Sequence, residues 1–219
     1  MQSNVIRFTR MDQFEDPQEG IPLSAFVTYA EKLNLNLIQN MKLSELILDT
    51  RLFNRIPLPL QKKLNTINAI QKSSFLTCWF AEPRESVAMW SLYSNPDGVA
   101  VKIPFGKLTD QLQIEKTPFI SAYYGGRVLY QNFSTIYKNT SDNKTGKVAL
   151  RKDTSFQHES EFRFVVRTKD HHQNITGIDS LPLNLARLNI KVVCHPKMAA
   201  WKKKNIEHLL LAAGFTNAL

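Results

Sequence analysis

The segment of residues 152–166, KDTSFQHESEFRFVV, predicts a β-strand whose two faces differ in character. Side chains alternate along a strand, so apolar residues share one face and charged residues share the other. The apolar set is Phe162, Phe164 and Val166, and the charged set is Glu159, Glu161 and Arg163. Because the apolar face has to be buried, it fixes the register of the strand. The strand therefore carries a row of charges on the face opposite its apolar side.

Two interpretations of this charged row stay open at the level of sequence. Glu159 and Glu161 are two residues apart, which on a strand is roughly 6.6 Å, too far to share a proton directly but close enough to reach one ligand. The first interpretation is a solvated outer face with cross-strand ion pairs, each contributing about 0.2–1 kcal/mol. The second interpretation is a binding or catalytic site.

Strand and helix signals along the rest of the chain predict an α+β fold. Apolar or alternating runs indicate strands in four segments: 5–10, 73–80, 119–130 with an interruption at Gly125-Gly126, and 189–196. Helix-like spacing predicts a helical block near residues 22–72, broken by prolines at 57 and 59, and a C-terminal helix ended by Gly214. We expect a single domain over residues 1–219 with a mixed or mostly antiparallel sheet, and a mobile surface loop at 131–147.

A short helix is predicted after Glu85, in the stretch ESVAMWSLY. Its apolar residues cover nearly the whole circumference of the helix, so we expect other elements to enclose it. A turn at Asn95-Pro96-Asp97-Gly98 and a further strand follow.

The charge of the chain favours anionic partners. Its 28 basic and 19 acidic side chains give a formal net charge of +9, which suits a nucleotide or a nucleic acid, or serves solubility alone. No stretch reaches the ~18 consecutive apolar residues of a membrane span, and the first residues do not resemble a secretory signal. The sequence predicts a cytoplasmic protein with no membrane partner.

Familiar cofactor and metal motifs are absent from the sequence. Cys78 and Cys194 lie in apolar runs without a CxxC pair, and His171-His172 lies in a polar loop without companion ligands. There is no glycine-rich phosphate loop, no HExxH and no GxSxG. We therefore expect no metal site and no bound cofactor, apart from a substrate such as NAD.

Three blocks of the sequence resemble an uncharacterised bacterial family known as domain of unknown function 2971. They are FTRMDQFEDPQEG, SFLTCWFAEPRESVAMWSLYSNPDGVAVKI and LRKDTSFQHESEFRFVV. The resemblance implies that the recurring polar and aromatic positions of that family are Asp16, Glu19, Glu85, Trp90, Tyr93, Lys152, Glu159, Glu161 and Arg163.

The motif Glu159-Ser160-Glu161 is also similar to the Glu-x-Glu of ADP-ribosyltransferases. The resemblance implies that Glu161 binds the nicotinamide ribose of NAD and supports the departure of nicotinamide, with Arg7 near the phosphates and Thr77 at the usual Ser-Thr position. The resulting hypothesis is an enzyme that binds a nucleotide-like anion in a basic cleft. Its catalytic residues are Glu161 and Glu159, and its substrate-binding residues are Lys152, Arg163, Arg7, Glu85, Trp90 and Tyr93.

Two further functions are compatible with the sequence. A non-enzymatic nucleic-acid-binding or defence-associated module would use the net charge and the run Lys202-Lys203-Lys204, and its binding would weaken steeply with salt. A scaffold that assembles with another protein is the third alternative.

Overall fold

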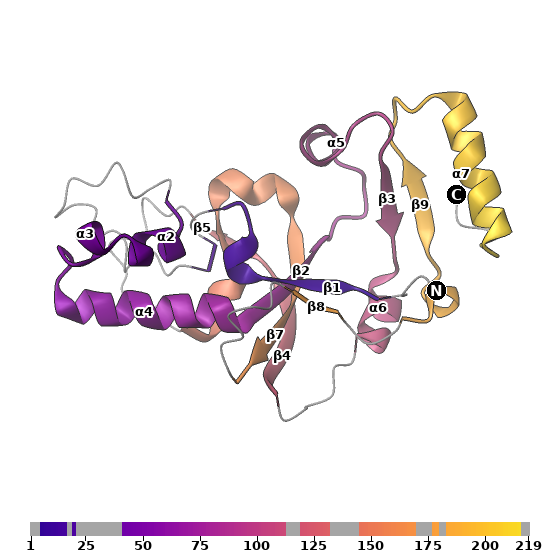
Figure 1. Ribbon diagram of the computed structural model, residues 1–219. Coiled ribbons are helices and arrows are strands. Elements are labelled where there is room, and N and C mark those ends of the chain that lie inside the picture. Colours follow the sequence, from indigo (N-terminus) through magenta and orange to yellow (C-terminus); the bar gives the residue numbers. More distant parts are fainter. Residues whose placement is uncertain are drawn as a thin grey trace. The chain divides into compact units, whose positions relative to one another are not determined.

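The computed structural model describes residues 5–16, 19–20, 41–112, 119–131, 145–169, 177–179 and 183–215. The chain divides into two compact units. Unit 1 contains the described residues 5–6, 82–112 and 183–215, and unit 2 contains the other described residues. Figure 1 labels helices and strands of both units.

Unit 2 is built on a five-stranded sheet with the order β4-β7-β2-β1-β8. Every neighbouring pair in this sheet is antiparallel. The strands are β1 (Arg7–Arg10), β2 (Ser74–Phe80), β4 (Ile120–Arg127), β7 (Glu161–Thr168) and β8 (Gly177–Asp179). Two short strands, β5 (Leu129–Gln131) and β6 (Arg151–Asp153), pair in parallel as a second sheet. The 3-10 helices η1 (Met11–Gln13), η4 (Thr145–Leu150) and η5 (Thr154–Glu159) belong to the same unit.

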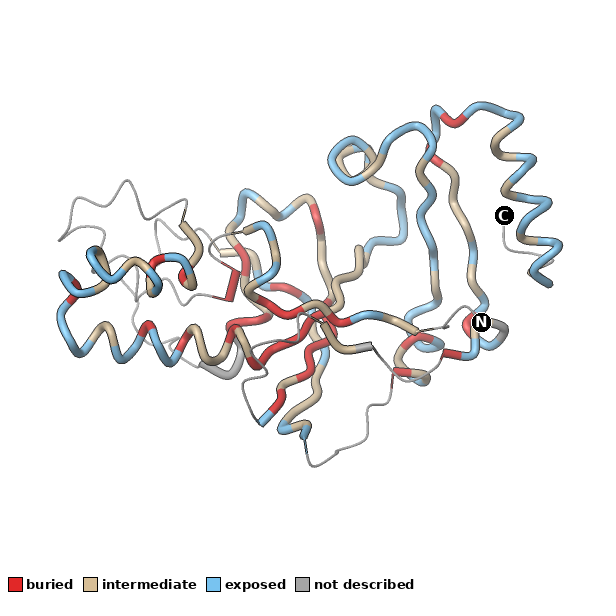
Figure 2. Tube along the Cα trace, in the orientation of Figure 1, coloured by how far each residue is buried: buried red, intermediate tan, exposed pale blue. Residues whose placement is uncertain are grey.

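Strand β7 lies inside the sheet and is buried on both faces. Phe164 and Val166 are buried on one face, and Arg163 and Val165 are buried on the other. The buried residues of β7, β2 and β1 appear in red in Figure 2. One face packs into a core cluster of Met11, Leu76, Ala149 and Val165. The charged face of β7 is thus covered, and the interpretation as a solvated outer face is wrong.

The two glycines of β4 do not interrupt the strand, contrary to the sequence prediction. β4 runs through Gly125 and Gly126, and its irregularity lies between Ile120 and Ala122. A Cβ on Gly125 would lie 3.0 Å from the Phe162 ring, and one on Gly126 would lie 2.7 Å from a Leu150 methyl. These glycines allow neighbouring side chains to pack against the backbone of the strand.

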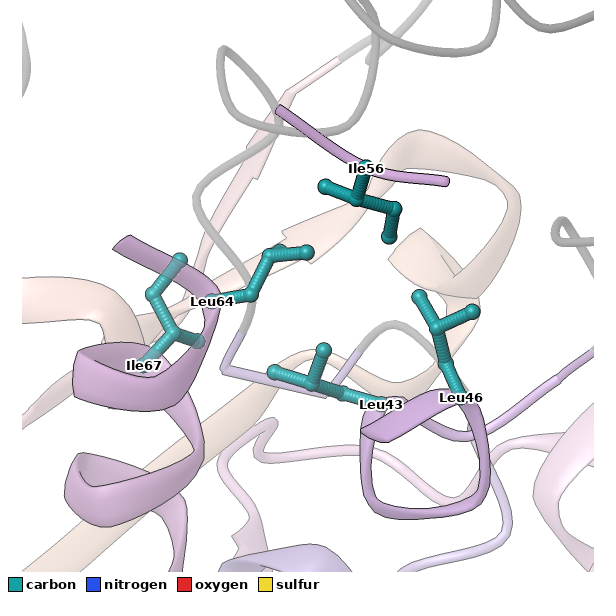
Figure 3. Close-up of a cluster of buried hydrophobic side chains, with 5 residues drawn as sticks. All are labelled: Leu43, Leu46, Ile56, Leu64 and Ile67. Carbon is teal, nitrogen blue, oxygen red and sulfur yellow. The ribbon is translucent and has the colours of Figure 1, made fainter. Parts of the chain in front are cut away.

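Three helices of unit 2 enclose a small apolar core of their own. α2 (Leu43–Leu48), α3 (Thr50–Phe53) and α4 (Leu58–Ser73) follow one another along the chain. The buried side chains of Leu43, Leu46, Ile56, Leu64 and Ile67 point toward one another (Figure 3). Leu64 and Ile67 are three residues apart on α4, so they lie on one face of that helix. Pro57 precedes α4 and Pro59 lies in its first turn, where a missing N–H costs no hydrogen bond.

The described residues of unit 1 form a two-stranded sheet and four helical segments. β3 (Val99–Lys102) pairs antiparallel with β9 (Lys191–Cys194). The helical segments are α5 (Val87–Tyr93), α6 (Phe105–Gln111), η6 (Leu185–Arg187) and α7 (Ala200–Ala212). None of the residues of α5, β3 or α7 is buried, and these segments are mostly pale blue or tan in Figure 2.

The enclosure expected for α5 is wrong for the described part of the chain. Val87, Leu92 and Tyr93 are all exposed. Tertiary packing decides whether an apolar side chain is covered, and the spacing of apolar residues in a seven-residue helix cannot show this.

The structure also bears on the predicted fold class, the predicted sheet type and the predicted end of the C-terminal helix. The α+β class and the mostly antiparallel sheet are confirmed. So is the end of the C-terminal helix at Gly214, whose φ is +87°. The expectation of one domain stays a prediction. Residues 21–40 of the predicted helical block, most of the predicted loop at 131–147, and His171-His172 lie outside the described residues. No helix among the described residues is both long enough and apolar enough to cross a membrane.

Candidate functional site

The Glu159-Ser160-Glu161 motif does not lie entirely on a strand, contrary to the sequence prediction. Glu159 ends the 3-10 helix η5, and β7 begins at Glu161. Ser160 between them has φ +39° and ψ +50°, a left-handed conformation. The alternation of side chains therefore starts only at Glu161. Because of the turn at Ser160, the spacing of roughly 6.6 Å expected for a continuous strand does not apply to Glu159 and Glu161. The carboxylates of both residues reach the same cation, Lys152.

Five charged side chains of alternating sign form a chain of ion pairs in unit 2. Glu19 receives two hydrogen bonds from Arg163, with Nη1–Oε1 and Nη2–Oε2 distances of 2.5 and 3.1 Å. The Nε of Arg163 donates to Oε2 of Glu161. Lys152 Nζ lies 3.6 Å from Oε1 of Glu161 and donates to Oε2 of Glu159 at 2.5 Å. We call Glu19, Arg163, Glu161, Lys152 and Glu159 the ionic cluster.

The ionic cluster is shielded from water to different degrees. The side chain of Arg163 is 0% exposed, whereas that of Glu161 is 11% exposed, the largest fraction of the five. Arg163 also donates to the carbonyl oxygen of Ala149 at 2.9 Å. Burying charges is unfavourable unless each is paired and hydrogen-bonded, and this arrangement meets that requirement for the guanidinium group. Glu161 is thus the most exposed member of the ionic cluster.

Two neighbouring aromatic side chains contact inner members of the ionic cluster. The Tyr130 hydroxyl on β5 accepts a hydrogen bond from the backbone N–H of Glu161 at 2.8 Å. Burial raises the pKa of Tyr130 to about 12, so its hydroxyl keeps its proton at neutral pH. Lys152 Nζ lies 4.3 Å from the centre of the Phe156 ring. A cation over an aromatic ring is stabilised by the electrons of the ring face.

The ion pairs shift the protonation of their members. Burial would raise the pKa of Glu161, but the charge and hydrogen bond of Arg163 and the charge of Lys152 lower the pKa below its ordinary value. Burial raises the pKa of Glu19, and Arg163 counteracts part of this shift. Burial opposes the charged form of Arg163, yet the carboxylates of Glu19 and Glu161 raise its pKa well above the ordinary value. Glu161 is therefore an ionised carboxylate at neutral pH.

Strand register places two of the other predicted residues on opposite faces of the sheet. Thr9 pairs with Leu76 and Leu76 pairs with Val165, so Arg7 and Glu161 lie on the same face. Arg7 is exposed, and a Cβ on Gly177 would lie 2.6 Å from its Nε. Thr77 pairs with Phe164, on the opposite face from Glu161. The correspondence of Thr77 to the usual Ser-Thr position stays a prediction.

The thiol of Cys78 lies on the charged face as well. Cys78 pairs with Arg163 across the β2–β7 register, and burial raises its pKa to about 12. A thiol with so high a pKa is not a nucleophile at neutral pH, because the thiolate is the reactive form. Cys78 and Cys194 are both free.

The remaining predicted residues lie in unit 1. Trp90 Nε1 donates to Oε2 of Glu85 at 3.0 Å, and the Trp90 ring meets the His195 ring edge-on, with 5.2 Å between their centres. Tyr93 is exposed on α5. Two lysines of the run on α7 are not fully available to a nucleic acid. Lys202 Nζ lies 2.5 Å from Asp97, and Lys203 is half-buried. The nucleic-acid-binding alternative stays a prediction.

Glu19 was missed by the reasoning from charge patterns, although the family resemblance includes its position. It lies 144 residues before Arg163 in the chain, so strand alternation gives no signal for it. Within the described residues, no group of three or more potential ligands is arranged to hold a metal ion. A small hollow beside Glu19 is also lined by Asp12, Asp16, Lys42, Ser44 and Gln71.

Comparison with known families supports the resemblance found in the sequence. Residues 89–164 match the family described as "Protein of unknown function (DUF2971)". The matched segment contains Trp90 and Tyr93 of unit 1 and four of the five members of the ionic cluster, Lys152, Glu159, Glu161 and Arg163. No curated protein and no solved structure is similar enough to match the chain.

Proposed function

We propose that the protein is an ADP-ribosyltransferase-like enzyme in which the carboxylate of Glu161 stabilises positive charge on a ribose. In such a reaction the bond between ribose C1′ and nicotinamide breaks, and its electron pair leaves with nicotinamide. The sugar becomes oxocarbenium-like until a nucleophile attacks C1′. A fixed carboxylate is most effective against such a charge when it is preorganised and partly withdrawn from water.

The observation that carries this proposal is the state of Glu161. Its pKa is lowered, so it is ionised at neutral pH, and it is the most exposed side chain of the ionic cluster. Oε2 is held by Arg163, whereas Oε1 lies 3.6 Å from Lys152, beyond hydrogen-bond distance. Oε1 is thus the oxygen suited to accept a bond from a ribose hydroxyl.

The other members of the ionic cluster act by holding Glu161 in place. Arg163 is fully buried and makes internal contacts, so we assign it to positioning Glu161 and not to contact with substrate. Lys152 and Glu159 limit the movement of the same carboxylate from its other side. Glu159, as the first glutamate of the motif, keeps its proposed catalytic role by holding Lys152 beside Glu161.

Anion binding has to come from residues outside the ionic cluster. Its three carboxylates exceed its two cations, so it carries one net negative charge when all five are ionised. A phosphate is repelled by that charge, whereas a cationic sugar is attracted. Arg7, exposed on the same face of the sheet, is the proposed phosphate ligand. Glu85, Trp90 and Tyr93 lie in unit 1, and their predicted substrate contacts stay a prediction.

Release of nicotinamide from NAD by the purified full-length chain tests this function. We expect turnover in the parent protein and a loss of about 100-fold or more in Glu161→Gln, the range typical for a residue that stabilises charge in the transition state. Asp110→Asn, an amide substitution of an exposed carboxylate on α6, is the matched control and should retain the parent rate.

Circular dichroism of each variant separates a chemical effect from loss of the fold. Folded Glu161→Gln with the same rate as the parent would overturn the role of Glu161. Absence of nicotinamide release by the folded parent protein, with NAD and with added arginine or protein acceptors, would overturn the enzyme itself.

A further inference from the structure

The outer edge of β3 in unit 1 has backbone groups available for another strand. His195 N–H bonds to the carbonyl oxygen of Gly98, so Gly98 and His195 form a hydrogen-bonded pair. Such pairs alternate along an antiparallel ladder, which makes Val99 and Val101 the residues whose backbone groups point away from β9. No described residue forms a backbone hydrogen bond with that outer edge.

The side chains of β3 are incompletely covered on both faces. Val99 and Val101 share one face and are 45% and 51% exposed. Ala100 and Lys102 are exposed on the other face. A sheet of two strands is marginally stable in water, and a third strand with an apolar face adds most of the missing burial.

Two lysines of equal charge stand directly opposite each other at the end of this sheet. Lys102 pairs with Lys191 in the β3–β9 register, and both are exposed. Like charges in opposed positions destabilise a strand pair. The described part of unit 1 is basic as a whole, with nine Lys or Arg against five Asp or Glu. A carboxylate next to Lys102 would relieve the repulsion.

We propose that the β3 edge binds an extended segment of a partner protein that alternates apolar and acidic residues. The backbone of the segment pairs with Val99 and Val101, its apolar side chains extend the face of these valines, and its carboxylates meet Lys102 and Lys191. This is recognition by strand addition, in which backbone bonds give affinity and alternate side chains give specificity. A second copy of the chain fits less well, because each copy carries a net charge of +9.

Binding of a fluorescent peptide with the core Val-Glu-Val-Glu-Val-Glu tests the proposal with the full-length chain. Fluorescence anisotropy should show saturable binding that Lys102→Glu weakens about fivefold, as expected from replacing an attractive cross-strand pair by a repulsive one. Lys107→Glu on α6 changes the net charge equally outside the sheet and should leave the affinity unchanged. Methylation of alternate peptide nitrogens should abolish binding, because it removes the donors that face β3.

Four results would overturn the proposal. They are absence of binding, equal binding of a Val-Lys peptide, equal binding of the methylated peptide, and equal weakening by Lys102→Glu and Lys107→Glu. A concentration-dependent dimer of the peptide-free chain that Val101→Pro disrupts would assign the edge to a second copy. Sedimentation with anionic vesicles, without peptide binding, would assign the surface to a membrane. Circular dichroism confirms that each variant remains folded.

Discussion

The charged residues of the two units differ in burial and in the sign of their neighbours. In unit 2 the five residues of the ionic cluster alternate in sign and are almost fully enclosed. In unit 1 Lys102 and Lys191 have the same sign, face each other and are exposed. Buried charges depend on partners within the molecule, whereas exposed charges are screened and can exchange partners. The ionic cluster thus makes unit 2 dependent on internal pairing, and the β3 edge of unit 1 keeps its charges for a ligand.

The largest effect should come from removing one partner of Arg163. Glu19→Leu leaves a fully buried guanidinium with an unpaired side, so we expect the free energy of unfolding to fall by about 3–5 kcal/mol. Urea denaturation measures it. Glu207→Leu, the same change at an exposed position of α7, should alter the free energy by less than about 0.5 kcal/mol.

A double variant shows whether the loss comes from the unpaired charge. Glu19→Leu combined with Arg163→Met removes both partners, and an apolar replacement of a buried pair is often tolerated. We expect the double variant to be more stable than Glu19→Leu alone. If Glu19→Leu costs no more than Glu207→Leu, the ionic cluster does not hold unit 2 together.

The second prediction compares a leucine-to-alanine substitution in unit 2 with the same substitution in unit 1. Leu64 of α4 is 3% exposed in the helical core, whereas Leu92 of α5 is 62% exposed. Leu64→Ala should lower the free energy of unfolding by about 2–5 kcal/mol, because it leaves a cavity. Leu92→Ala should change it by less than about 0.5 kcal/mol, since alanine also favours a helix.

Urea or thermal unfolding of both leucine variants measures this contrast. A cost above ~1 kcal/mol for Leu92→Ala would mean that α5 is covered in solution. The contrast between an enclosed unit 2 and an exposed unit 1 would then fail at this helix. Leu64→Ala, in the core drawn in Figure 3, confirms that the assay detects a lost apolar contact.

The sequence predicts the framework of unit 2 because its signals are local. Alternation locates β2 to within one residue and the end of β7 to within two, and it identifies Phe164 and Val166 as buried. The predicted start of β7 at residue 152 is nine residues too early, because β6 and η5 occupy residues 151–159. A strand of 4–8 residues carries enough period-2 signal for this.

Parts of the candidate site depend on contacts that no local pattern reveals. The left-handed turn at Ser160 separates Glu159 from the strand, and serine gives no signal for that conformation. Glu19 meets Arg163 across 144 residues, and only the fold brings the two together. The exposure of α5 likewise follows from tertiary packing and not from its apolar sequence.

The smallest effect tests how far the ionic cluster depends on the charge of Glu161. The pKa of Glu161 is lowered in the folded protein, despite burial, by Arg163 and Lys152. A carboxylate with a lowered folded-state pKa stabilises the fold at pH values above its unfolded pKa of about 4.3. The stabilisation is lost as the pH falls through the folded pKa, where Glu161 becomes neutral in both states.

Urea unfolding of the parent and of Glu161→Gln between pH 7 and pH 3 measures this loss. The difference in free energy of unfolding should be largest near neutral pH and should shrink below about pH 4, because the neutral acid resembles the amide. Tyr130→Phe is the matched control, since it removes the hydroxyl that accepts the Glu161 N–H and, with a pKa of about 12, does not titrate in this range. Its difference from the parent should stay constant. A Glu161→Gln difference that grows as the pH falls would show that Glu161 is held neutral by its burial, and the ionic cluster would then lack the charge on which the proposed reaction depends.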